Sequence, residues 1–100
     1  MNIQAKIWNN SLWVNEVSPK VIKERIECIL KDSGFQLLGF IEHFFIPQGY
    51  TAMWLLGESH CCIHTFPEEG KTYIELSSCN EVKYIIFFKK IDLWLNTTRK

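Results

Sequence analysis

The sequence lacks several features that would point to a particular partner or compartment. Lysine and arginine together number 11, as do aspartate and glutamate, so no excess charge attracts nucleic acid or an anionic membrane. No run approaches the roughly 18–20 apolar residues that span a bilayer. Residues 1–10 contain no apolar core of the signal-peptide type. We therefore expect a cytoplasmic protein that binds neither nucleic acid nor membrane.

The cysteines and the chain length set further bounds. Four cysteines without a secretory signal predict reduced thiols rather than disulfides. One hundred residues predict a single domain, 1–100. A domain of this size buries a modest core, so an oligomer would help to stabilise it.

The apolar pattern predicts two helices and five strands. Ser18 can cap a helix that has Pro19 at its first position and ends before Gly34. A second helix is expected over 81–95. Strands are expected over 3–9, 35–46, 50–58, 59–66 and 71–79, and turns over 47–49 and 67–70. The order βαββββα favours an α+β fold, a two-layer sandwich whose mainly antiparallel sheet has helices on one face.

Histidine, serine and cysteine residues gather between positions 58 and 79. Strand alternation would place His60, Cys62 and His64 on one face, and Cys79 could add a fourth zinc ligand. Ser59 could instead be a nucleophile with His64 as its base and the Cys79 thiol nearby. They could also be ordinary strand residues, since a free cysteine packs like a small apolar side chain. Spacing alone leaves all three interpretations open and favours the last.

Two quoted segments resemble a known family signature. "ESHCCIHTFPEEG" (58–70), followed by "YIELSSC" (73–79), is similar to the motif of the prokaryotic S-adenosylmethionine decarboxylase proenzymes. That motif has the form E-S-H-x-x-I-H-T-[WF]-P-E-x-G and precedes a strand that ends in cysteine. The segments "GFIEHFF" and "PQGYTAMWLLGES" resemble the family's approach to it. The resemblance covers about residues 20–95.

The resemblance implies an enzyme that makes its own cofactor. Members of this family cut themselves between the residues that correspond here to Glu58 and Ser59, which would leave a β chain of residues 1–58 and an α chain of residues 59–100. The new end of the α chain becomes a pyruvoyl group. That group forms a Schiff base with the substrate amine and withdraws electrons as carbon dioxide leaves. The implied activity is S-adenosylmethionine decarboxylation in spermidine and polyamine biosynthesis.

The same resemblance implies roles for individual residues. Ser59 is the self-cleavage nucleophile and the precursor of the pyruvoyl group. His64 takes the proton in the elimination step, a task that suits an imidazole. Cys79 returns a proton to the product carbon. Thr51 supplies a hydroxyl that assists processing.

The substrate and the assembly are implied in the same way. Phe45 and Phe66 correspond to aromatic residues that sandwich the adenine, and Glu68 corresponds to a carboxylate near the nucleotide. No metal is expected, and a homodimer is expected in which both chains contribute to each site. The first strand lacks the acidic residue that the family has there. Arginine or ornithine is therefore an alternative substrate, and a non-catalytic, unprocessed homologue that binds metal or a partner is an alternative function.

Overall fold

The computed structural model describes residues 5–98, and its elements follow the predicted order. Helix α1 begins where Ser18 caps it, with its hydroxyl accepting a hydrogen bond from the Val21 N–H, and Pro19 is its first residue. The elements are β1 (Trp8–Val14), α1 (Pro19–Asp32), β2 (Leu37–Phe44), β3 (Tyr50–Leu56), β4 (Ser59–Phe66), the short 3-10 helix η1 (Pro67–Glu69), β5 (Lys71–Ser78) and α2 (Glu81–Thr98). Within residues 5–98, neither helix combines the length and apolar character needed to cross a membrane.

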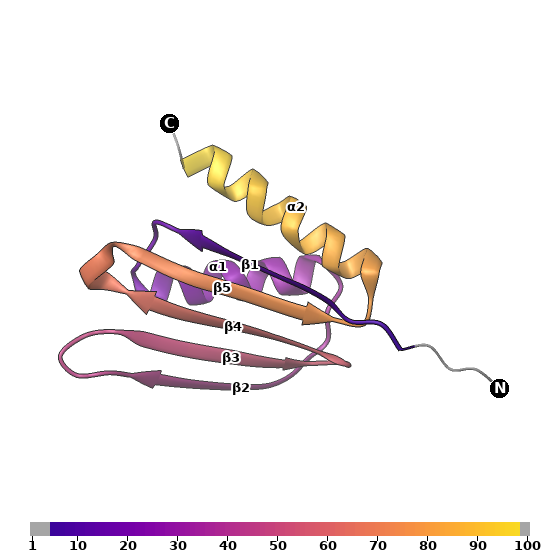
Figure 1. Ribbon diagram of the computed structural model, residues 1–100, viewed down its shortest axis with the longest axis horizontal. Coiled ribbons are helices and arrows are strands. Elements are labelled where there is room, and N and C mark those ends of the chain that lie inside the picture. The colour runs from indigo at the N-terminus through magenta and orange to yellow at the C-terminus, as the bar shows by residue number, and fades with distance from the viewer. Residues whose placement is uncertain (1–4, 99–100) are drawn as a thin grey trace.

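The strands form one antiparallel sheet in the order β1-β5-β4-β3-β2 (Figure 1). Tight connections join β2 to β3, β3 to β4 and β4 to β5, so these strands are neighbours. Strand β1 reaches the other margin by pairing with β5, and Trp8 lies opposite Ser78. Antiparallel pairing brings the start of β4 next to the end of β5, where Ser59 lies opposite Ser78.

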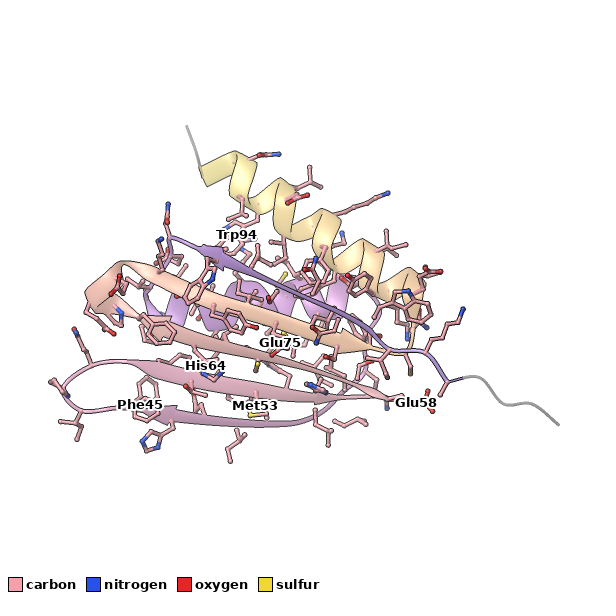
Figure 2. The ribbon with its side chains drawn as sticks, in the orientation of Figure 1. Phe45, Met53, Glu58, His64, Glu75 and Trp94 are labelled. Carbon is pink, nitrogen blue, oxygen red and sulfur yellow. The ribbon has the colours of Figure 1, made fainter. Side chains whose placement is uncertain are left out.

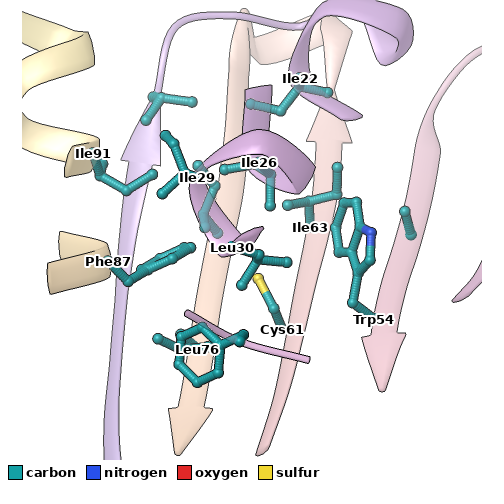
Figure 3. Packing of buried hydrophobic residues seen from close by; sticks show 14 of the residues in the cluster. Ile22, Ile26, Ile29, Leu30, Trp54, Cys61, Ile63, Leu76, Phe87 and Ile91 are labelled. Carbon is teal, nitrogen blue, oxygen red and sulfur yellow. The ribbon is translucent and has the colours of Figure 1, made fainter. Parts of the chain in front are cut away.

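Both helices lie on one side of the sheet, which confirms the predicted α+β sandwich. Alternate residues of the central strands face α1 and form the core with it (Figure 3). Helix α2 adds Phe87 and Ile91 to this core along the β1 side. The largest fully buried side chain is Trp54, and its indole N–H donates to Glu27 on α1.

The first strand differs from the prediction. Strand β1 runs over Trp8–Val14 rather than 3–9, and residues 3 and 4 of the predicted strand lie outside the described residues. Pairing with β5 sets these bounds, since Trp8 lies opposite Ser78 and Val14 opposite Thr72, and Val14 is buried against the core. Asn9, a polar residue within the strand, is stabilised by a side-chain hydrogen bond to Glu75 on β5.

The other face of the sheet has no helix over it, and we call it the open face. Cross-strand pairing and alternation place on it a set of large apolar side chains that are exposed in the single chain: Trp13, Ile41, Met53, Leu55 and Phe66. One sheet face thus builds the core, and the second is an extensive apolar surface.

Candidate active site

The turn between β3 and β4 holds Glu58 in a strained conformation. Glu58 has φ of 54°, in the left-handed region that non-glycine residues rarely adopt. Such strain concentrates at functional sites when the surrounding structure maintains it. The Glu58–Ser59 peptide therefore lies where a tight turn meets the first residue of β4.

The thiol of Cys79 contacts Glu58 on two sides. Its Sγ lies 3.1 Å from the Glu58 carbonyl oxygen and 3.2 Å from the carboxylate Oε2, so both oxygens are within reach of its single S–H proton. The hydrogen bond to the Glu58 carboxylate raises the pKa of the Cys79 thiol. The thiol therefore keeps its proton at neutral pH, as a donor to the Glu58 carbonyl must.

The Ser59 hydroxyl belongs to the residue that follows this carbonyl, and it lies on the core side of the sheet. It donates to the Ser78 hydroxyl, with 2.8 Å between the two oxygens. Sequence reasoning missed Ser78, because only the pairing of β4 with β5 brings the two serines together. Glu58, Ser59, Ser78 and Cys79 form one group, which we call the processing cluster.

His64 and Thr51 form a second group, on the open face. Thr51 Oγ1 lies 2.9 Å from His64 Nδ1. Tyr73 stacks beside the imidazole, with 6.1 Å between ring centres. When Nδ1–H donates to Thr51, the lone pair of Nε2 is free to act as a base. The structure thus brings the predicted base and its supporting hydroxyl together, and adds Tyr73, which the sequence had not indicated.

Aromatic rings continue from this group. Phe66 packs against Trp13 with 5.7 Å between ring centres, and Trp13 packs edge-on against Tyr73 at 5.3 Å. Phe45, in the connection between β2 and β3, is half exposed and contacts His43. Phe45 and Phe66 are accessible to a planar ligand, but nothing in the single chain brings them face to face.

Glu68 is exposed on η1, at this same end of β4. Its carboxylate accepts a hydrogen bond of 3.3 Å from the Gln48 side chain in the connection between β2 and β3. The candidate nucleotide carboxylate is thus close to the segment that carries Phe45.

The processing cluster is distant from His64. His64 lies five positions after Ser59 on an extended strand, about 16 Å away at the usual rise per residue. The two side chains also point to opposite faces, since their positions differ by an odd number. Figure 2 shows Glu58 at one end of the sheet and Phe45 towards the other, with His64 between them. One chain therefore carries both groups but does not combine them.

The zinc hypothesis finds no ligand set in the part of the chain that the structure describes. Over residues 5–98, no three or more His, Cys, Asp or Glu side chains are grouped to hold a metal ion. Cys62 contacts Glu75 at 3.6 Å. Burial and the Glu75 carboxylate raise the pKa of the Cys62 thiol to about 11. In the metal-free chain, a thiol with such a pKa is protonated at neutral pH.

Comparison with known proteins identifies the family. The model of the S-adenosylmethionine decarboxylase family matches residues 16–99. The chain belongs to this family. Its sequence resemblance, first seen over 20–95, thus extends over nearly all of the described chain.

Individual relatives agree with this assignment. The S-adenosylmethionine decarboxylase proenzyme of Prochlorococcus marinus (strain MIT 9211) is 43% identical over 60 residues, which are 60% of this chain and 49% of that protein. The proenzyme of Methanococcus vannielii is 32% identical over 80 residues, 80% of this chain and 65% of that protein. The crystal structure of the adenosylmethionine decarboxylase from Aquifex aeolicus VF5 superposes with a TM-score of 0.72 at 25% identity. That match covers 90% of this chain and 78% of the other. The chain spans about half the length of the first of these relatives.

Proposed function

We propose that the chain is a proenzyme that cleaves its own Glu58–Ser59 bond and then decarboxylates S-adenosylmethionine. One observation carries the proposal: the carbonyl of this strained peptide accepts a hydrogen bond from Cys79 and is directly followed by the Ser59 hydroxyl. An electrophile polarised by a donor and a nucleophile on the next residue are what an N-to-O acyl shift needs. Membership of the family supports the proposal independently.

In the first step Ser59 Oγ bonds to the Glu58 carbonyl carbon. Negative charge develops on the carbonyl oxygen, and the Cys79 thiol at 3.1 Å stabilises it. The carbon–nitrogen bond then breaks, and the hydroxyl proton ends on the Ser59 nitrogen, which leaves an ester and a free amine. Relief of the left-handed Glu58 backbone favours the step.

In the second step a base removes the Ser59 α-proton. The Cβ–O bond breaks, Glu58 leaves as a carboxylate, and residue 59 becomes dehydroalanine, whose imine form takes up water and loses ammonia. We assign the base to His64 Nε2, with Thr51 holding Nδ1. Because His64 is about 16 Å from Ser59 along the same strand, the histidine must come from a second chain.

The open face supports a homodimer with shared sites. It exposes Trp13, Ile41, Met53, Leu55 and Phe66 on one sheet face, and such a gathering of apolar side chains is typical of a protein–protein interface. Suppose that the open faces of two chains pack together about a two-fold axis that lies between the sheets and is perpendicular to the strands. One end of each sheet then lies over the opposite end of the partner's sheet. The end of the sheet that carries the processing cluster in one chain would then lie over the partner's His64, Phe45 and Phe66, and each site would draw on both chains.

The resulting pyruvoyl group would supply a ketone that withdraws electrons from the substrate as carbon dioxide leaves. The residues around position 59 fit such a group. Cys79 contacts Glu58, the residue that precedes position 59, and keeps its proton through this contact, so it would be available to protonate the product carbon. The partner's aromatic side chains would stack on the adenine and lie close to the sulfonium.

We place the enzyme in polyamine biosynthesis in the cytoplasm. The four cysteines are free thiols, which agrees with a reducing compartment. Glu75 adds a carboxylate to the open face beside Asn9 of β1, the strand that lacks the family's acidic residue. Arginine and ornithine are cations as well, so this carboxylate does not distinguish them from S-adenosylmethionine. The family match favours S-adenosylmethionine, and substrate assays must include all three.

Intact mass spectrometry of freshly expressed protein tests the proposal. We expect fragments 1–58 and 59–100, the second starting with a pyruvoyl group that borohydride reduces. We expect the cleaved protein to release carbon dioxide from S-adenosylmethionine. The matched control is Ser59→Ala, which stays whole because neither attack nor elimination is possible without the oxygen.

Two results would change the conclusion in different ways. A wild-type chain that stays uncut, with no carbonyl reactive towards borohydride, would make the chain a non-catalytic homologue. A cleaved chain that releases carbon dioxide from arginine or ornithine but not from S-adenosylmethionine would refute the substrate and leave the processing chemistry in place.

A further inference from the structure

We infer that Ser78 is a positioning residue that orients the Ser59 hydroxyl for self-cleavage. The inference rests on the proposed function and adds a residue to the processing cluster. Ser59 and Ser78 lie directly opposite each other on β4 and β5, and both side chains point to the core side of the sheet. Their oxygens are 2.8 Å apart, and the side chain of Ser78 is fully buried, with 0% exposure.

The backbone of Asn80 sets the direction of this hydrogen bond. The Asn80 N–H donates to Ser78 Oγ at 2.9 Å, and the Ser78 hydroxyl proton can go to the Asn80 carbonyl at 3.3 Å. With its proton directed to this carbonyl, Ser78 Oγ accepts from Ser59. The Ser59 hydroxyl thus donates its proton away and keeps its lone pairs free.

That orientation matters for attack on the Glu58 carbonyl. A serine side chain otherwise samples three staggered rotamers. If Ser78 donated to Ser59 instead, the bond would occupy a lone pair that the new carbon–oxygen bond needs. The contact with Ser78 selects one rotamer and one hydrogen direction, which reduces the freedom that must be lost before reaction.

The end of β5 therefore acts on both reacting groups. Cys79 donates to the carbonyl oxygen of the electrophile, and Ser78 accepts from the nucleophile. Strand alternation explains how neighbours can do this, since adjacent side chains point to opposite sides of the backbone.

The test measures self-cleavage of the full chain with time. We expect Ser78→Ala to cleave more slowly, up to about tenfold, which is the typical effect of one neutral hydrogen bond. Ser78→Cys, which keeps nearly the same shape but bonds weakly, should also slow cleavage. Ser78→Thr, which keeps the hydroxyl, should restore the rate. Hydroxylamine should trap no more ester than in wild type, because attack is slowed rather than elimination.

Thr72→Val is the matched control. Thr72 is a buried hydroxyl on the same face of β5, at its other end, and donates to the Glu16 carbonyl at 2.6 Å. We expect this variant to lose stability but to cleave at the wild-type rate. Wild-type rates in both Ser78→Ala and Ser78→Cys, or equal slowing in Thr72→Val, would refute the role of Ser78. An uncut wild-type chain would instead refute the proposed function itself.

Discussion

A chain that has lost its own His64 should be rescued by a partner that retains it. The experiment combines two variants that are each inactive alone. His64→Ala keeps the Ser59 nucleophile but lacks the base, and Ser59→Ala keeps the base but cannot be cut. In a mixed dimer, one of the two sites has both native residues.

The structure sets the size of the effect. Proton transfer needs heavy atoms about 2.6–3.2 Å apart, whereas the strand places His64 about 16 Å from Ser59 of the same chain. Rescue must therefore come entirely from mixed dimers. Equal amounts of the two chains that pair at random place about half of the His64→Ala chains in mixed dimers, so about half of them should be cut. A tenfold excess of Ser59→Ala should bring the fraction to about nine tenths by the same pairing statistics.

The assay is intact mass spectrometry after the two chains are denatured and refolded together. An affinity tag on Ser59→Ala confirms that mixed dimers form. His64→Ala refolded alone is the control, and it should stall with a hydroxylamine-sensitive ester. Mixed dimers in which the His64→Ala chain stays uncut would refute the shared site. So would a monomeric wild-type protein that cleaves at a rate independent of its concentration.

Three other outcomes follow from single contacts. In the Ser59→Ala precursor, Glu58→Gln removes the carboxylate that raises the pKa of the Cys79 thiol. Alkylation of this thiol, followed by peptide mass spectrometry, should therefore begin at lower pH. An unchanged pH profile would contradict the contact between Cys79 and the Glu58 carboxylate. Phe66→Ala should weaken S-adenosylmethionine binding by about 0.5–1.5 kcal/mol in calorimetry of the cleaved enzyme, and unchanged affinity would remove Phe66 from the site. Trp54→Ala should lower the free energy of unfolding in urea by about 3–5 kcal/mol, against little change in Val82→Ala on the exposed side of α2.

Local patterns were enough to predict both helices, the last four strands and the fold class. The Ser18–Pro19 start of α1 and the turns before β3 and β5 depend on residues within a few positions of each other. Their effects act over one helical turn or one hairpin, so they are visible in the sequence. The first strand was misplaced because its position depends on β5, more than fifty residues away, and on the side-chain bond between Asn9 and Glu75.

The chemistry-bearing residues were predicted from the motif, but their grouping was not. Their nearness in the sequence suggests that Ser59 and His64 act together, yet an extended strand places them far apart and on opposite faces of the sheet. Conversely, Ser78 and Cys79 meet the Glu58–Ser59 peptide only because β4 and β5 are antiparallel and in register.

The local sequence thus specifies which residues can react, because side-chain chemistry, strand alternation and turn conformation are properties of short segments. Which of those residues touch is decided by sheet register and by burial of one face against the helices. Both depend on contacts summed over the whole chain. The open face is the plainest case: its strands carry apolar residues on both sides, and only the folded chain shows which side the helices leave uncovered.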